Sequence, residues 1–155
     1  MAETPCSQLL ANQHHQIDAG VKGIAEGGSD LPALARSLAL LRLHVYVEEA
    51  ILFPPLVKSG LTMPVFVMKR EHGQMWPLLE SLAAASAKAA AEGTMREDGR
   101  KLYQLLQMHN PKEESIVYTA LDRLQAQPAE PSFATAIQAA QLPEGWRCAL
   151  APKQP

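Results

Sequence analysis

The chain has 155 residues, a net charge of −2, 47% apolar residues and 19% charged residues. A chain of this length forms one domain with a single sizeable core. Its nearly balanced charge argues against binding to nucleic acid or to an anionic membrane surface. No apolar run approaches the roughly 20 residues that span a bilayer.

The N-terminus lacks the basic and then apolar pattern of a secretory signal. The two cysteines, Cys6 and Cys148, do not form a disulfide framework, so we expect a cytoplasmic protein. Whether they pair with each other as a terminal staple is left open.

The first half of the chain predicts two helices, because apolar residues recur at steps of three and four. The first covers residues 7–25 and ends at a Gly-Gly pair. The second begins after Asp30, which can cap it, with Pro32 in its first turn. We expect it to stop at Pro54 and Pro55.

The second half predicts two more helices. The third starts with Thr62 as its cap and fades into an alanine-rich run that ends at Gly93. The fourth covers residues 95–125. Pro77 and Pro111 fall inside these helices, where each costs about 3 kcal/mol or more. A kink or a local bulge is therefore predicted at each proline.

The predicted fold is all-α. Short connections make consecutive helices antiparallel neighbours, so residues 1–127 are expected to form an up-down-up-down antiparallel four-helix bundle. Residues 128–155 are expected to form a short helix, at about 132–140, and a Pro-rich C-terminal tail, packed on or trailing the same domain.

Histidines and glutamates mark the interior of this bundle. Four of the five histidines fall on the apolar stripes, one in each helix. Two glutamates each lie four residues after such a histidine, and positions i and i+4 share one helix face. The candidate metal ligands are His14, His44, Glu48, His72, His109 and Glu113. His14 is in phase with its stripe and His15 is about 100° away, so His14 is preferred and His15 is the alternative.

These residues predict a metal centre. A buried glutamate without a partner costs several kcal/mol or becomes protonated. Metal ions compensate this cost, because imidazole nitrogen and carboxylate oxygen are their ligands. Six ligands suit two ions bridged by the carboxylates, with a bridging hydroxide or oxide. Glu49 and Glu114, one position further on, are expected to be solvated or to hydrogen-bond the ligands.

The two His-x-x-x-Glu segments are similar to each other. HVYVEEAILFPPL from His44 and HNPKEESIVYTAL from His109 share the histidine, both glutamates, an isoleucine and the final leucine. This similarity predicts an internal two-fold repeat of a helix pair, with the two metal ions beside its axis.

Four stretches resemble the hemerythrin-like family, also called the HHE cation-binding domain. They are QHHQID around His14, HVYVEEAILFP from His44, REHGQM around His72 and HNPKEESIVY from His109, and the resemblance covers about residues 5–125. It implies a four-helix bundle with two iron ions joined by an oxo or hydroxo bridge. The ligands would be the six residues above, with Glu48 and Glu113 bridging. Manganese and zinc also accept such ligands.

The sequence departs from the oxygen-carrying hemerythrins. Those proteins have a second histidine on the third helix, four residues after the first, where this chain has Trp76. The ligand set is more similar to that of di-iron repair proteins of nitrosative and oxidative stress. Trp76 either fills space beside the site or shapes a dioxygen pocket.

These observations support a small non-haem di-iron protein that binds or senses dioxygen or nitric oxide. The alternative is a di-iron enzyme or repair factor that turns over peroxide or nitric oxide, or donates iron to damaged iron–sulfur clusters. Whether the chain is an enzyme is left open. A third hypothesis is a bundle with a structural metal, or none, that acts through partner contacts. The expected partner is dioxygen, nitric oxide or peroxide, with a redox partner of unspecified identity.

Overall fold

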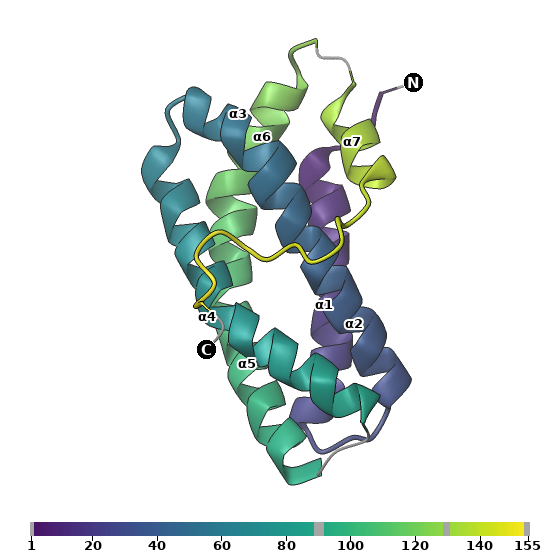
Figure 1. The fold of residues 1–155 in the computed structure, drawn as a ribbon. Helices are drawn as coiled ribbons and strands as arrows, with labels where there is room; N and C mark the ends of the chain where they lie inside the picture. The colour runs from purple at the N-terminus through teal and green to yellow at the C-terminus, as the bar shows by residue number, and fades with distance from the viewer. Residues whose placement is uncertain (1, 89–91, 129–130, 154–155) are drawn as a thin grey trace.

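A computed structural model describes residues 2–88, 92–128 and 131–153 as an all-helical fold, and these residues contain no strand. Figure 1 shows how the α-helices are arranged; two further elements, η1 and η2, are π-helical turns. The elements are α1 (Cys6–Ala25), α2 (Leu31–Tyr46), η1 (Val47–Leu52), α3 (Phe53–Lys58), α4 (Thr62–Ala87), α5 (Glu92–Lys112), η2 (Glu113–Val117), α6 (Tyr118–Gln125) and α7 (Phe133–Ala139).

Four helical rods form the bundle. The first and third are α1 and α4. The second consists of α2, η1 and α3 in unbroken succession, and the fourth of α5, η2 and α6. The rods run alternately up and down (Figure 1). The predicted four-helix bundle, with a short C-terminal helix, is therefore confirmed.

The helix ends agree only in part with the prediction. Asp30 caps α2, because its side chain accepts a hydrogen bond from the backbone N–H of Ala33 at 3.0 Å. The prediction for Thr62 is wrong: it is the first residue of α4, and the preceding residue makes no side-chain cap bond. The end predicted at Gly93 is also wrong, since α4 ends at Ala87 and α5 already begins at Glu92. The sequence contains no signal for the end of α4 inside the alanine-rich run, because alanine favours helix. Residues 89–91 of this run lie outside the described residues.

Pro54 and Pro55 do not end the second rod, contrary to the prediction. They occupy the first turn of α3, where a missing N–H is tolerated. The turn before them is π-helical, and the N–H of Phe53 bonds to the carbonyl of Glu48, five residues back. The hydrogen-bond register thus shifts just ahead of the prolines. Pro111 likewise stands two residues before η2, whereas α4 remains α-helical through Pro77.

The apolar core consists of two clusters, and each rod passes from one to the other at or close to its histidine. On α4, for example, Met68 belongs to one cluster and Met75 to the other, with His72 between them. On α1, Leu10 and Ile17 flank His14 in the same way. The predicted ligands therefore form a polar layer across the middle of the bundle.

The segment after α7 crosses the bundle. We call residues 140–153 the C-terminal strap; it is the yellow segment that crosses α2 and reaches α4 in Figure 1. Trp146 makes edge contacts with the rings of Tyr46 and Trp76, with centroids 5.3 and 5.6 Å away. Leu150 lies on Gly73 of α4: a Cβ placed there would be 2.4 Å from the Leu150 carbonyl oxygen.

Both cysteines are buried free thiols, so the structure contains no terminal staple. Burial raises the pKa of Cys6 to about 12 and that of Cys148 to about 11. Across the described residues, every helix is too short or too polar to serve as a bilayer span.

The contact between α1 and α2 depends on Gly20. A Cβ there would lie 2.0 Å from the Ser37 hydroxyl and 2.8 Å from the backbone oxygen of Ala33. We expect Gly20→Ala to destabilise the protein by about 1–3 kcal/mol through overpacking, which lowers the melting temperature by about 2–4 °C per kcal/mol. Thermal unfolding followed by circular dichroism measures this.

Gly23→Ala is the matched control, because it lies on the same helix with nothing within 4 Å of the added carbon. The free energy of unfolding of this variant should rise by up to about 1 kcal/mol, because alanine has a higher helix propensity than glycine. Equal melting temperatures for the two variants would contradict the close approach at Gly20.

Candidate metal centre

The six predicted ligands meet in the polar layer. They are His14, His44, Glu48, His72, His109 and Glu113, each at most 3% exposed. All four rods contribute: α1, α2 with η1, α4, and α5 with η2. The structure brings His14 into the layer and leaves His15 exposed at the surface.

The carboxylate of Glu48 lies between two histidines from different helices. Its Oε1 is 2.9 Å from Nε2 of His44, and its Oε2 is 3.2 Å from Nε2 of His72. Each oxygen therefore faces a different imidazole.

The carboxylate of Glu113 is divided in the same way. Its Oε1 is 3.1 Å from Nε2 of His14, and its Oε2 is 3.0 Å from Nε2 of His109. The layer thus contains two ligand groups that share both glutamates. One is His14, His44, Glu48 and Glu113; the other is Glu48, His72, His109 and Glu113; within each group the ligand atoms lie within 4.8 Å of one another.

Three atoms in this layer lack an oriented hydrogen bond. They are Oε2 of Glu48, Oε2 of Glu113 and Nε2 of His72, all buried. The two oxygens lie 3.2 and 3.5 Å from that nitrogen, so the atoms are close but not aligned for hydrogen bonding. Buried polar atoms without partners are rare and cost about 1–3 kcal/mol each. A metal ion would satisfy all three, and the donor set therefore fits a metal.

The four imidazoles are oriented from outside the layer. Each Nδ1 lies within hydrogen-bond distance of a side-chain oxygen: His14 with Glu114 at 3.1 Å, His44 with Gln13 at 2.7 Å, His72 with Glu49 at 2.7 Å and His109 with Glu71 at 2.9 Å. When Nδ1–H donates outward, the Nε2 lone pair faces the layer, where a metal would need it.

Two of these outer partners were missed from the sequence. Hydrogen bonding by Glu49 and Glu114 agrees with one of the two expectations. Gln13 and Glu71 each directly precede a ligand histidine, but each bonds a histidine on another helix. A polar residue immediately before His14 and before His72 was the available signal.

Electrostatics favour the charged form of three imidazoles in the absence of metal, those of His44, His72 and His109. Burial by itself would lower the pKa of His44, but the charge of Glu48 and hydrogen bonds to both glutamates outweigh it and raise the pKa to about 9. Against the same effect of burial, hydrogen bonds to Glu113, Glu48 and Glu49 raise the pKa of His72. The charge of Glu113, with hydrogen bonds to Glu113 and Glu71, raises the pKa of His109. Burial opposes ionisation of Glu113, yet His109 and the other imidazoles lower its pKa well below the usual range.

Tyr118 is a further polar member of the layer. Its hydroxyl lies 2.5 Å from Oε1 of Glu48, 3.0 Å from Oε1 of Glu113 and 3.0 Å from Nε2 of His14. Burial and the two carboxylates raise the pKa of Tyr118 well above its usual value, so it stays protonated and donates. Phe53 occupies the corresponding position in the segment that begins at His44. Its ring stacks on the ring of His72, with the centroids 5.9 Å apart and an interplanar angle of 7°. The two ligand groups are therefore chemically different.

The π turns explain why periodicity did not find Tyr118. In an α-helix, residue i+5 lies about 140° round the axis from residue i. The extra residue of a π turn reduces this to about 40°. The N–H of Tyr118 bonds to the Glu113 carbonyl, as that of Phe53 bonds to Glu48. Both rings are thereby turned toward the layer.

A small cavity lies beside the histidines. It is lined by His14, Leu41, His44, Val45, His72, Met75, Leu106, His109 and Asn110, and about 10 Å³ is open to the centre of a water-sized molecule. This is room for about one water molecule. Neither glutamate nor Tyr118 lines it, so the cavity and the carboxylates approach the imidazoles from different sides. Trp76 does not line it either.

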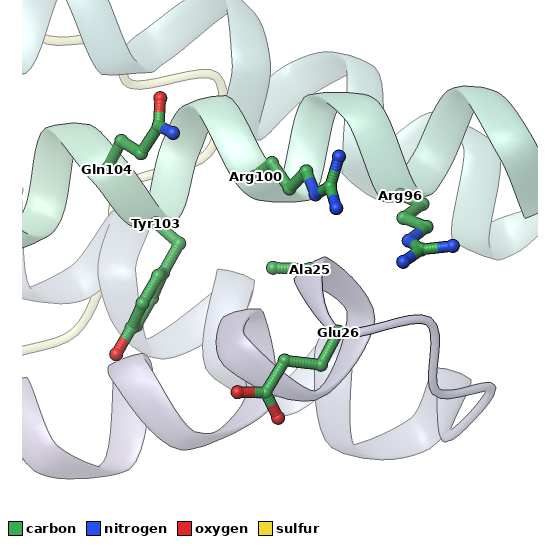
Figure 2. A pocket seen from close by; sticks show the side chains of 6 residues that line it. All are labelled: Ala25, Glu26, Arg96, Arg100, Tyr103 and Gln104. Atoms are coloured by element: carbon green, nitrogen blue, oxygen red, sulfur yellow. The ribbon is translucent and has the colours of Figure 1, made fainter.

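A larger hollow of about 450 Å³ lies elsewhere, between the C-terminal end of α1 and α5. Figure 2 shows Arg96, Arg100 and Tyr103 on α5 and Glu26 at the end of α1. It contains none of the predicted ligands and is not part of the candidate centre.

The C-terminal strap reaches the candidate centre through Glu49. One oxygen of Glu49 faces Nδ1 of His72, and the other accepts a hydrogen bond from the backbone N–H of Ala149 at 2.9 Å. The strap therefore holds the residue that orients one imidazole.

Comparisons with known proteins agree with this site. Residues 7–121 match the sequence model of the hemerythrin HHE cation binding domain. Uncharacterized proteins Rv1995 and MT2051 of Mycobacterium tuberculosis and Mb2018 of Mycobacterium bovis are each 29% identical over 108 residues, or 63% of this chain. The chain covers 42% of the length of each of these relatives. No solved structure matches.

We expect the pH dependence of stability to differ between metal-free and metal-loaded protein. A raised imidazole pKa stabilises the metal-free fold below the unfolded pKa of about 6.5, and this contribution is lost as pH rises through about 9 for His44. The lowered pKa of Glu113 stabilises the metal-free fold above a pH of about 4.5, and this stabilisation is lost as the pH falls into the acid range. Metal requires neutral imidazole and displaces protons. The rise in melting temperature on adding metal should therefore grow from pH 6 to pH 9, and a constant rise would contradict the protonated layer.

Gly73→Ala tests the seat of the strap. The added carbon would lie 2.4 Å from the Leu150 oxygen, whereas the helix itself tolerates alanine. We expect the strap to be displaced, so that Cys148, 4% exposed, reacts with a thiol reagent at least about tenfold faster. Gly23→Ala is the control, and Cys6 is the internal reference thiol. Unchanged reactivity of Cys148 would show that the strap does not rest on Gly73.

Proposed function

Because the chain belongs to the hemerythrin HHE cation-binding domain family, we propose that its buried layer binds two iron ions and that the loaded centre binds or senses dioxygen or nitric oxide. The observation that carries this proposal is the division of each glutamate's two oxygens between two histidines. A carboxylate placed in this way suits a bridge between two ions.

The ligands divide into two halves in this proposal. His14 and His44 would hold one ion, His72 and His109 would hold the other, and both glutamates would serve both ions. The protein would then offer two nitrogens and two oxygens to each ion. An ion that prefers six ligands keeps open positions for a bridging hydroxide or oxide and for a small ligand. Iron would supply reversible one-electron chemistry toward such a ligand.

The outer carboxylates support a metal that reaches a charge of +3. Two divalent ions and two bridging glutamates leave a charge of +2. Glu49, Glu71 and Glu114 add negative charge around the imidazoles, although Lys112 also pairs with Glu71 and Glu114 is 38% exposed. Negative charge close to a metal stabilises its higher oxidation state. Iron fits this environment better than zinc, which has no redox chemistry.

The surroundings of the imidazoles support a small exogenous ligand. The cavity beside them has apolar walls of Leu41, Val45, Met75 and Leu106 and has room for about one water-sized molecule. Trp76, which stands where oxygen carriers have another histidine, packs in the apolar cluster instead. One half of the centre therefore has fewer protein ligands than in the oxygen carriers.

Metal analysis and optical titration test the proposal. We expect two iron ions per chain in the wild type and in His15→Ala, about one in His14→Ala and none or nearly none in Glu113→Ala, because Glu113 serves both ions. The reduced protein should change its near-ultraviolet and visible spectrum on exposure to dioxygen or nitric oxide. The loaded protein should melt at a higher temperature than the metal-free protein. Its free energy of unfolding should rise by about 4 kcal/mol when the free metal concentration exceeds Kd a thousandfold.

Two results would refute it. One is purified protein that takes up no metal and gains no stability when metal is added. The other is an iron-loaded protein whose spectrum is indifferent to both gases. Stoichiometric zinc or manganese with no iron uptake would refute the assignment of iron and leave the ligand set standing.

A further inference from the structure

The cavity beside the histidines contains one polar side chain other than the imidazoles. Asn110 follows His109 on α5, is 6% exposed and lines this cavity. Among the described residues that line it, the remainder are the four histidines and four apolar side chains. The amide of Asn110 is therefore the group most able to distinguish one small ligand from another.

The orientation of this amide is fixed by Asp18. The Nδ2 group of Asn110 lies 3.2 and 3.3 Å from the two carboxylate oxygens of Asp18. A carboxylate only accepts hydrogen bonds, so the nitrogen and not the oxygen of the amide faces it. Gln107 donates to the same carboxylate at 3.1 Å and helps to hold it in place.

The oxygen of the same amide has no partner. Oδ1 of Asn110 is buried and makes no hydrogen bond with any described residue. An unpaired buried acceptor is costly, and native structures satisfy nearly all such atoms. Asn110 both carries the unpaired oxygen and lines the cavity. A molecule in the cavity that can reach Oδ1 and donate a proton to it would satisfy this acceptor.

We propose that Asn110 is the specificity-determining residue of the centre and selects a protic oxygen ligand, hydrogen peroxide, over aprotic nitric oxide. This inference rests on the proposed di-iron centre and adds hydrogen peroxide to the two gases as a ligand class. Hydrogen peroxide has an O–H to donate to Oδ1 while its other oxygen faces the metal. Nitric oxide has no proton, so it leaves the acceptor unsatisfied and gains nothing from it.

The test compares two ligands in three proteins, each loaded with iron. Binding of hydrogen peroxide to the oxidised protein is measured by rapid mixing and absorbance, and binding of nitric oxide to the reduced protein by anaerobic titration. Asn110→Leu keeps the approximate shape and removes the acceptor. We expect it to weaken peroxide binding about tenfold, the effect of one lost hydrogen bond, and to change nitric oxide binding by less than about twofold.

Asp18→Ala is the matched control, because it releases the clamp on the amide and leaves the acceptor in place. It should weaken peroxide binding less than Asn110→Leu does. Circular dichroism and melting temperatures check that each variant folds. Should leucine prevent folding, Asn110→Ala removes the same acceptor with less bulk, and the same ratio of effects is expected.

The outcomes separate the two proposals. If the wild type binds hydrogen peroxide and nitric oxide, and Asn110→Leu weakens the binding of both equally or of neither, the role of Asn110 is refuted. The di-iron function then stands. An equal loss of peroxide binding in Asp18→Ala and Asn110→Leu also refutes it, since the clamp and not the acceptor would be responsible. A wild type that binds neither ligand refutes this inference, and the proposed function falls with it only if dioxygen also leaves the spectrum unchanged.

Discussion

The structure depends on one electrostatic constraint: two carboxylates and four imidazoles share a buried layer between two apolar clusters. Each carboxylate oxygen faces an imidazole from a different helix, so the layer ties all four rods together. Protons satisfy this layer only in part, because Oε2 of both glutamates and Nε2 of His72 have no oriented partner. A cation placed among them would complete it, and for this reason the same layer that unites the fold is its candidate site.

The internal repeat gives the layer its symmetry, and single residues break it. Both halves place a π turn at the glutamate, and both turn an aromatic ring toward the imidazoles. One ring is Tyr118, whose hydroxyl bonds Glu48, and the other is Phe53, which stacks on His72. Asn110 adds a second asymmetry, on the side of the cavity. Two metal positions built from one duplicated motif would therefore differ in their surroundings.

The C-terminal strap extends the centre beyond the segment that matches the family. The match covers residues 7–121, whereas Ala149 donates to the glutamate that faces His72. The strap closes over α4 at Gly73, the residue next to that histidine. The imidazole's orientation is therefore set partly by residues nearly eighty positions away in the chain.

The sequence by itself determined the bundle and predicted the six candidate ligands that the structure brings together, because apolar periodicity and i, i+4 spacing are local properties of a helix. It also identified His14 over His15, which the structure leaves exposed. Only the tertiary structure decided that Gln13 and Glu71 serve histidines on neighbouring helices, and that the strap reaches Glu49. It also showed that π turns carry the helix past Pro54 and turn Tyr118 inward. A π turn changes the phase of everything after it, and contacts between helices depend on packing that no local pattern encodes.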